Sequence, residues 1–363
     1  MRTWVRDVAV MAALLTVTSC EFAGGAGVPS RSPHHDGLQI GLLLSNNQIP
    51  RWEKFDRPFF TKRIGELCGD CTVRYANAGG DLATQVQQID SMISDRVDVL
   101  VIAAVNGTAI RSSVERAERE GVPVVAYGRL IQGPIAGYVT SDITRSGEIQ
   151  AQALLHAMAG KGHGDRIVML NGAYSDPSAA AYKKAALSVF RDRGKITKSY
   201  DVFGWRPDIA NSDMSGAIAS LGADRIDGVY AANDGMASGA IAALKAAKVQ
   251  PLPPVVGQNA DLTAVQSIVR GDQYMTVYNT NKPWAETAAA MALALGRGAG
   301  LDGIAHQKVD SPTTKDIPAV ILKPVPVTVG NIKDTLVKDG MYTIAQICTP
   351  KLASACQKAG LLP

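Results

Sequence analysis

The sequence predicts an α/β fold of two doubly wound parallel-sheet lobes joined by a multi-strand hinge. From Leu38 onward, apolar runs of about five or six residues alternate with amphipathic stretches of about twelve or more, and this alternation is typical of parallel sheets with right-handed crossovers. The apolar runs lack a two-residue period, as expected for strands that are covered on both faces. A chain of 363 residues is long enough to bury two cores.

This pattern predicts eight strands and eight helices in alternation. The expected strands are residues 39–44, 72–76, 97–103, 122–127, 166–170, 197–203, 226–230 and 254–258. The expected helices are residues 52–67, 81–95, 108–120, 146–159, 178–193, 207–221, 236–247 and 262–270.

The alternation is interrupted at three places, which predict crossings between two lobes. These are residues 138–143, residues 278–281 and a proline-punctuated segment after His306. The expected domains are a first lobe of 38–142 plus 279–311, a second lobe of 143–278 plus 312–345, and a C-terminal tail of 346–363. Lobes joined by such a hinge can close on a ligand held between their strand ends.

The N-terminus is typical of an export signal. Arg2 and Arg6 precede an apolar run at 8–17 that is too short to span a bilayer. Residues 17–20, Val-Thr-Ser-Cys, resemble the bacterial lipobox, in which the cysteine is lipidated, so Cys20 is the expected lipid anchor. The alternative is an ordinary secretory signal that contains a cysteine. With Cys20 as the anchor, residues 1–19 are the expected signal peptide. Residues 20–37, which are rich in Gly, Ser and Pro, are the expected flexible tether.

Composition and motifs give no indication of catalysis or nucleic-acid binding. The net charge is +4, and no basic run contains interleaved aromatic residues. The motifs GxSxG, HExxH and GxxxxGK[ST] are absent from the sequence, and its five histidines lack metal-ligand spacing. We therefore expect no catalytic residues, no cofactor and no metal site.

Four cysteines other than Cys20 suggest disulfides in an exported protein. They are Cys68, Cys71, Cys348 and Cys356, and two local bridges are the simplest pairing. The Cys68-Gly-Asp-Cys71 motif could instead be a redox site or half of a zinc site. The lack of a second such motif or a suitably spaced histidine disfavours zinc.

Asn233 and Asp234 follow an expected strand and precede an expected helix. In parallel sheets, ligands bind beyond the carboxyl ends of strands, and this pair offers amide donors and carboxylate acceptors. Capping of the helix is an equally good explanation for either residue taken alone.

Other strand-to-helix junctions carry aromatic, amide, guanidinium and carboxylate groups that together match sugar chemistry. Indole rings pack against the C–H faces of a sugar, and its hydroxyl groups need paired donors and acceptors. Trp52 and Trp205 could sandwich one sugar ring, although either alone is more often a packed core residue. The candidate ligand-binding residues are Arg51, Trp52, Arg129, Asp142, Trp205, Asn233, Asn259 and Asn279.

Motifs across nearly the whole chain beyond residue 38 resemble the type I periplasmic binding proteins for sugars, most closely their xylose-binding members. They are 51–54 (R-W-E-K), 103–107 (A-A-V-N-G), 126–129 (A-Y-G-R), 147–151 (G-E-I-Q-A), 204–205 (G-W), 232–234 (A-N-D), 257–261 (G-Q-N-A-D), 275–278 (M-T-V-Y) and 331–340 (N-I-K-D-T-L-V-K-D-G). No single motif is specific, but together they are.

The resemblance implies ligand contacts at six positions and departures at three others. The matching positions are Arg51, Trp52, Arg129, Asp142, Trp205 and Asn233. Gly128 and Asn259 stand where the xylose-binding pattern has Asp, and Asn279 stands where it has Lys. Amides bind hydroxyl groups less strongly than carboxylates, and glycine leaves space, so the ligand can differ from xylose.

The resemblance further implies a lipid-anchored substrate-binding subunit of an ABC importer. Its expected ligand is D-xylose or a similar monosaccharide, and its expected partners are the membrane permease and, through Cys20, the outer face of the cell membrane. We expect a monomer that does not bind nucleic acid. A sugar receptor that signals to a membrane kinase or chemoreceptor, and a binder of pentitols or other polyols, remain alternatives.

Overall fold

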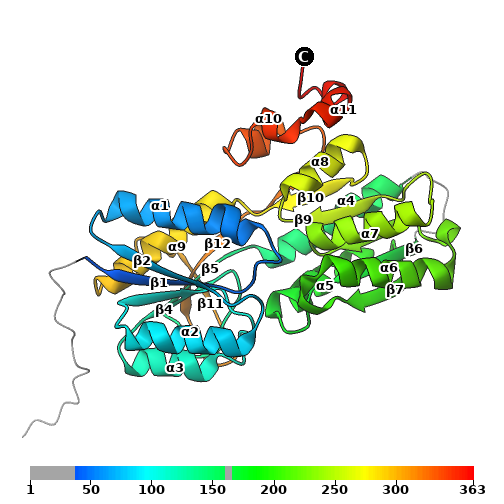
Figure 1. Ribbon diagram of the computed structural model, residues 1–363. Helices are drawn as coiled ribbons and strands as arrows, with labels where there is room; N and C mark the ends of the chain where they lie inside the picture. The colour runs from blue at the N-terminus through cyan, green and yellow to red at the C-terminus, as the bar shows by residue number, and fades with distance from the viewer. Residues whose placement is uncertain (1–36, 160–165) are drawn as a thin grey trace, which may run out of the picture. The chain divides into compact units, whose positions relative to one another are not determined.

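The computed structural model describes residues 37–159 and 166–363. Two separate sheets lie within them, and helices cover both faces of each (Figure 1). The predicted fold class is confirmed. The expected signal peptide, Cys20 and nearly all of the tether lie outside the described residues.

The first lobe is built on a seven-stranded sheet with the order β11-β12-β5-β4-β3-β1-β2. All neighbours are parallel except β11 and β12. Helices α1 and α9 cover one face, and α2 and α3 the other (Figure 1). The strands are β1 (Gln39–Leu44), β2 (Thr72–Asn77), β3 (Val99–Ile102), β4 (Val124–Tyr127), β5 (Gly137–Ser141), β11 (Gln307–Val309) and β12 (Ile317–Leu322), and the helices are α1 (Arg57–Leu67), α2 (Leu82–Ser94), α3 (Arg111–Arg119) and α9 (Asn281–Gly296).

The second lobe is built on a six-stranded sheet with the order β13-β10-β9-β8-β6-β7. Only β13 is antiparallel to its neighbour. Helix α4 packs against α5, and α6 packs against α7. The strands are β6 (Arg166–Asn171), β7 (Lys195–Asp201), β8 (Gly228–Ala231), β9 (Val255–Gln258), β10 (Met275–Tyr278) and β13 (Val325–Val327), and the helices are α4 (Ile143–Met158), α5 (Pro177–Phe190), α6 (Pro207–Leu221), α7 (Asp234–Ala246) and α8 (Leu262–Arg270).

Local sequence explains why helices begin directly after strands. Asp81, Asp142, Asp176 and Asn233 each accept a hydrogen bond from a backbone N–H in the first turn of the following helix. Short polar side chains of this kind satisfy amide donors that would otherwise lack partners. The inner strands are fully buried, as in the Val-Leu-Val-Ile sequence of β3, whereas the outer strands β2 and β7 are partly exposed. Burial on both faces explains the absence of a two-residue period in the inner strands.

Two elements differ from the predicted ones, a strand that ends earlier and a helix whose first turn is a π-helix. The strand expected at 197–203 ends at Asp201, because the chain enters a short 3-10 helix, Phe203–Trp205, in which Gly204 has φ 63°. Glycine adopts this left-handed conformation readily. The helix expected at 52–67 begins as a π-helix, Trp52–Asp56, before continuing as α1.

The third crossing lies later than predicted. Residues 312–345 were expected in the second lobe, but β12 pairs with β5 in the first lobe's sheet, so the chain crosses between Leu322 and Val325. The prediction was wrong because it interpreted the prolines as marking the crossing. Pro318 in fact lies inside β12 and does not interrupt that strand. Proline's fixed φ is compatible with extended backbone. The other crossings lie between β5 and α4 and between β10 and α9.

Residues 346–363, expected as a tail, are a packed part of the second lobe. Helices α10 (Ile344–Ile347) and α11 (Ala353–Lys358) contact α8, and Ile347, Leu352 and Leu361 are buried in one cluster. Both expected disulfides, Cys68–Cys71 and Cys348–Cys356, are present. In the described part of the chain, no helix has the length and apolar character required to cross a membrane.

Close packing of α6 against α7 generates a prediction about stability. An added Cβ at Gly239 in α7 would lie 2.2 Å from the backbone oxygen of Pro207. We expect Gly239→Ala to lower the free energy of unfolding by about 1 to 3 kcal/mol through overpacking, measured by urea denaturation.

Gly216 in α6 provides the matched control, because an added Cβ there meets nothing within 4 Å. Gly216→Ala should raise the free energy of unfolding by about 0.5 to 1 kcal/mol, since alanine favours helix. Equal effects of the two substitutions would contradict the packing explanation.

Candidate functional site

Arg51 lies at the start of the π-helix that follows β1, and it is almost completely buried. Its Nε and Nη2 atoms donate to the two carboxylate oxygens of Asp56 at 2.9 and 2.5 Å. The hydroxyl of Tyr127 donates to the same carboxylate. Burial alone would lower the pKa of Arg51, but the Asp56 ion pair outweighs it and raises the pKa. Arg51 is therefore a permanently charged, fixed donor.

Two tryptophans of the first lobe flank this guanidinium. The Cζ atom of Arg51 lies 4.9 Å from the Trp52 ring centroid and 4.2 Å from that of Trp284, distances at which cation–π attraction operates. The ring of Tyr127 contacts both indoles, with centroid distances of 5.8 and 5.7 Å. Trp284 Nε1 donates to the carbonyl of Val139 at 3.0 Å. The first lobe thus presents a rigid aromatic wall.

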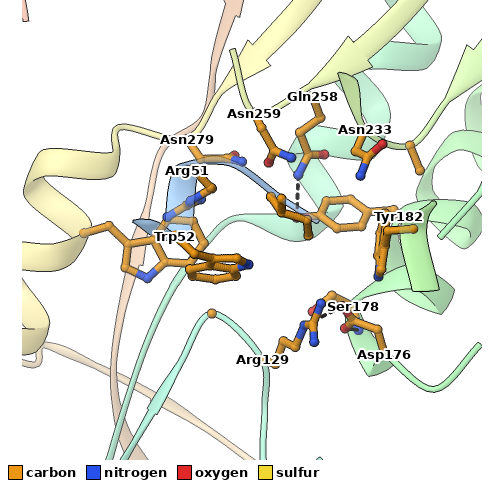
Figure 2. A pocket seen from close by; sticks show the side chains of 15 residues that line it. Arg51, Trp52, Arg129, Asp176, Ser178, Tyr182, Asn233, Gln258, Asn259 and Asn279 are labelled. Carbon is orange, nitrogen blue, oxygen red and sulfur yellow. Dashed lines mark hydrogen bonds and ion pairs between the residues drawn. The ribbon is translucent and has the colours of Figure 1, made fainter. Parts of the chain in front are cut away.

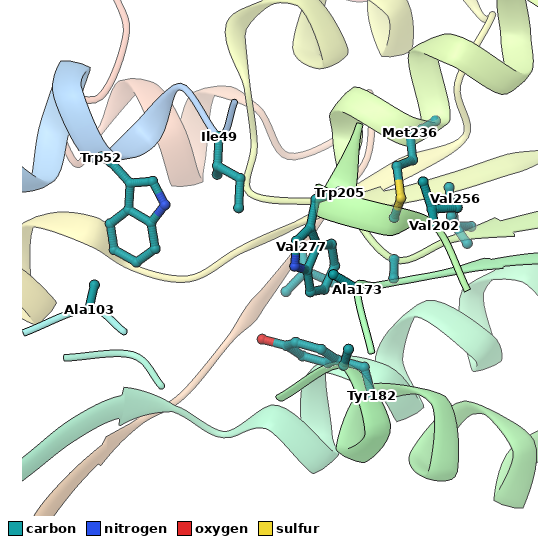
Figure 3. Packing of buried hydrophobic residues seen from close by; sticks show 14 of the residues in the cluster. Ile49, Trp52, Ala103, Ala173, Tyr182, Val202, Trp205, Met236, Val256 and Val277 are labelled. Carbon is teal, nitrogen blue, oxygen red and sulfur yellow. The ribbon is translucent and has the colours of Figure 1, made fainter. Parts of the chain in front are cut away.

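Trp205 provides a third indole, from the second lobe. Its backbone adopts φ 60°, which is uncommon for a bulky residue. An added Cβ at Gly172 would lie 2.1 Å from the Trp205 ring, so the glycine after β6 is what allows the indole to lie against that backbone. Figure 3 shows Trp52 on the first-lobe side and Trp205 with Tyr182 on the second-lobe side.

Carboxamides from consecutive strand ends of the second lobe point into the same space (Figure 2). Asn233 follows β8, Gln258 ends β9, Asn259 follows it, and Asn279 follows β10. Asn233 Oδ1 accepts from Met236 N at 2.8 Å, so this residue caps α7 and also lines the cavity. The capping explanation is therefore confirmed, and the position of Asn233 in the cavity is compatible with ligand binding as well.

An ion pair closes one side of the cavity. Arg129, in the loop after β4, donates through Nε to the carboxylate of Asp176 at 2.6 Å, and both side chains are buried. Arg129 Nη1 also donates to the carbonyl of Ala104 at 2.7 Å. Asp176 accepts from Ser178 N at 2.9 Å as it caps α5. The pair joins the two lobes.

Together these groups line a small cavity between the lobes, with a volume of about 50 Å³. Seven of the eight predicted residues line it, namely Arg51, Trp52, Arg129, Trp205, Asn233, Asn259 and Asn279. The volume of the cavity exceeds the roughly 10 to 15 Å³ that a cavity needs to hold a single water molecule. This is room for one small molecule.

Asp142, the eighth predicted residue, is not among the residues that line this cavity. Its carboxylate accepts from Arg145 N at 2.8 Å and caps α4, and its backbone N–H donates to Leu322 O at the crossing. In this structure Asp142 therefore caps a helix at the crossing and does not line the cavity.

Five lining side chains with polar or aromatic character were not predicted. They are Asp176, Ser178, Tyr182, Gln258 and Trp284. Asp176 and Gln258 stand at strand-to-helix junctions, so the rule that identified Asn233 could have found them. Tyr182 and Trp284 lie inside α5 and α9, where nothing in the local sequence separates them from packing residues.

A second layer of polar groups holds the amides in place. Asp234 is buried and accepts hydrogen bonds from Gln273 Nε2 at 2.9 Å, Thr276 Oγ1 at 2.8 Å and Asp261 N at 2.9 Å. Burial, and then the neighbouring charge of Asp261, raise the pKa of Asp234 well above its ordinary value. Burial raises the pKa of Asp261 to about 6, against the opposing charges of Lys54 and Arg51.

Comparison with known proteins agrees with this architecture. The model of the periplasmic binding protein domain matches residues 40–300. The D-xylose-binding periplasmic protein of Escherichia coli is 35% identical over 86% of this chain and 94% of its own, and that of Haemophilus influenzae is 34% identical over 92% and 98%. An ABC transporter solute-binding protein from Clostridium phytofermentans, solved with bound β-D-glucose, superposes with a TM-score of 0.79 at 25% identity, over 85% of this chain and 99% of its own.

The chain belongs to the periplasmic binding proteins, in the sugar-binding type I group. Proteins of this family bind solutes without transforming them. The chain is therefore a binding protein and not an enzyme, as the absence of catalytic motifs predicted.

The buried carboxyl of Asp261 generates a prediction about pH. Its pKa is raised from 3.8 to about 6, so the stability that it contributes is fully present below about pH 4 and is lost as the pH rises through about 6. Asp261→Asn removes this loss. Relative to the unsubstituted protein, the variant should gain about 2 to 3 kcal/mol of unfolding free energy between pH 4 and pH 8.

Asp272 is the control with the opposite sign. Burial alone would raise the pKa of its carboxyl, but hydrogen-bonded ion pairs with Arg270 and Lys245, at 2.8 and 2.7 Å, lower it. Asp272→Asn should therefore lose stability relative to the unsubstituted protein as the pH rises through the carboxyl's range. Urea denaturation at pH 4, 6 and 8 measures both variants. A pH-independent effect of Asp261→Asn would refute the assignment.

Proposed function

We propose that the protein is the extracytoplasmic substrate-binding lipoprotein of an ABC sugar importer and that it binds D-xylose or a similar monosaccharide between its lobes. One observation carries the ligand class. Four buried polar atoms that line the cavity have no hydrogen-bond partner within the described chain. Buried groups of this kind are costly unless they are paired, and a bound ligand with several hydroxyl groups would pair them.

The unpartnered atoms include both hydrogen-bond donors and acceptors, as the hydroxyl groups of a sugar require. Trp52 Nε1 and Trp205 Nε1 are donors, whereas Gln258 Oε1 and Asn279 Oδ1 are acceptors. A hydroxyl group donates one hydrogen bond and accepts others, so a ring with several hydroxyls can satisfy both kinds. The indole faces beside them suit the apolar faces of the same ring.

The charges in the cavity favour a neutral ligand. Arg51 is paired with Asp56, and Arg129 with Asp176. Each cation is balanced by an anion within 3 Å, so a phosphate, a carboxylate or an ammonium on the ligand would have no opposite charge left to meet. A neutral monosaccharide fits better than a sugar acid or an amino sugar.

Similarity to D-xylose-binding proteins supports xylose as the first candidate, and Gly128 bears on the fit. Gly128 has φ 75°, and an added Cβ there would lie 3.2 Å from the Trp284 ring and 3.4 Å from the Trp52 ring. A side chain at this position would fill space beside both indoles. The absence of one favours a ligand that reaches into this corner.

The proposed ligand class predicts selective binding of neutral monosaccharides. Calorimetric titration of the protein from residue 38 onward against D-xylose, D-glucose, xylitol, D-xylonate and D-glucosamine should give saturable binding of at least one neutral sugar and at least tenfold weaker binding of the charged compounds. Tighter binding of D-xylonate than of every neutral compound would overturn the charge argument. Absence of measurable binding for every compound in the panel would overturn the proposed function.

A substitution links that binding to the cavity. Trp205→Ala should weaken the tightest ligand by about 1 to 3 kcal/mol, because it removes a buried aromatic contact. Tyr174, a 76% exposed aromatic residue of the same lobe, is the matched control, and Tyr174→Ala should change the affinity less than twofold.

Lipid anchoring rests on the sequence around Cys20. We expect Cys20→Ala to abolish metabolic labelling with radioactive palmitate and to move the protein from the membrane fraction to the soluble extracytoplasmic fraction. Ser19→Ala, which keeps a small residue before the cysteine, should leave the fractionation unchanged. Continued membrane retention of the Cys20→Ala variant would rule out the anchor.

A further inference from the structure

A second, larger cavity adjoins the first on the side away from the hinge. It has a volume of about 490 Å³ and is lined in the first lobe by residues that follow β1, β2 and β3, and in the second by residues that follow β6 and β7. The hinge elements β5 and β12, with β10 and β13, lie toward the opposite edge of their sheets. This outer cavity therefore lies on the side of the cleft away from the hinge elements.

Three residues line both cavities, namely Arg129, Asp176 and Trp205. They form the wall between the sugar site and the outer cavity. Arg129 comes from the first lobe, and the other two come from the second. The wall is complete only when the ion pair between the lobes is made.

Each partner of the ion pair is held from its own lobe. Arg129 donates to the carbonyl of Ala104, at the end of β3, and Asp176 accepts from the first turn of α5. Both side chains are more than nine-tenths buried. A ligand substituent that extended outward would have to separate the pair and leave two buried charges unpaired, which is strongly unfavourable.

We propose that the Arg129–Asp176 pair, backed by Trp205, is a gate that determines ligand size by admitting a free monosaccharide and rejecting one that carries a second sugar unit. This inference rests on the proposed function of the cavity. A gate can be distinguished from a ligand contact by experiment. Loss of a contact weakens the binding of all ligands alike, whereas loss of the gate changes the ratio of the affinities for a monosaccharide and a disaccharide.

The variant that tests the gate replaces both charges together, since removing one would leave the other buried and unpaired. Arg129→Met combined with Asp176→Asn serves this purpose. Methionine keeps an unbranched apolar stem, and asparagine keeps the oxygen that caps α5. The matched control is Arg166→Met with Asp227→Asn, which removes a 2.9 Å ion pair of the second lobe that lines neither cavity.

The probes are two matched pairs, D-xylose with β-1,4-xylobiose and D-glucose with cellobiose. Either unit of a 1,4-linked disaccharide can be presented to the cavity, so each disaccharide tests substituents at both ends of the ring. The unsubstituted protein should bind its preferred monosaccharide at least 100-fold more tightly than the matching disaccharide. The gate variant should reduce that ratio at least tenfold, and the control variant should leave it unchanged.

The outcomes separate the gate from the proposed function. Binding of a monosaccharide and its disaccharide with similar affinity by the unsubstituted protein would overturn the gate, even if the gate variant failed to fold. An unchanged ratio in a folded gate variant, checked by circular dichroism, would also overturn it. Binding of neither D-xylose nor D-glucose by the unsubstituted protein would overturn the proposed function and the gate with it.

Discussion

The buried ion pair between Arg51 and Asp56 is the interaction on which the candidate site depends. It keeps a cation between two indole rings, where an unpaired charge would be strongly unfavourable. Tyr127, at the end of β4, completes the arrangement by donating to Asp56. The aromatic wall of the first lobe is thus assembled around one charged group whose position is fixed by residues from two strand ends and a π-helix.

The second lobe contributes in a different way. Its donors and acceptors come from successive ends of parallel strands, which meet along one edge of the sheet. Asn233 follows β8, Gln258 ends β9 and Asn279 follows β10, in the order of that sheet. The network around Asp234 then joins the backbone of Asp261 to the side chains of Gln273 and Thr276. Rigid backing of this kind fixes the loops that carry the amides of the candidate site.

Sequence reasoning recovered most of the site because most of it lies at strand ends. A junction between an apolar run and an amphipathic stretch can be recognised locally, and this found Arg51, Arg129, Trp205 and Asn233. The same rule included Asp142, whose carboxylate caps α4 instead. A cap and a ligand-binding residue have the same local sequence, and only the direction of the side chain separates them.

Other features depended on contacts between distant segments. Trp284 lies within α9, yet it reaches the cavity because α9 packs beside β4 and β5. Strand β12 belongs to the first lobe because it pairs with β5, which lies 181 residues earlier in the chain, as in the pair Ala319 and Tyr138. Neither fact has a local signal, since prolines around β12 indicate a break in structure whichever sheet the strand joins.

The sequence by itself determined the alternation of strands and helices, the two-lobe class, the local disulfides and the polar character of the cleft. These follow from periodicity, capping residues and cysteine spacing, which act over a few neighbouring residues. Tertiary structure alone decided which charges are paired, which polar atoms lack partners and which residues separate the two cavities. Those properties arise when side chains hundreds of residues apart, such as Arg51 and Trp284, are buried against each other and lose their contact with water.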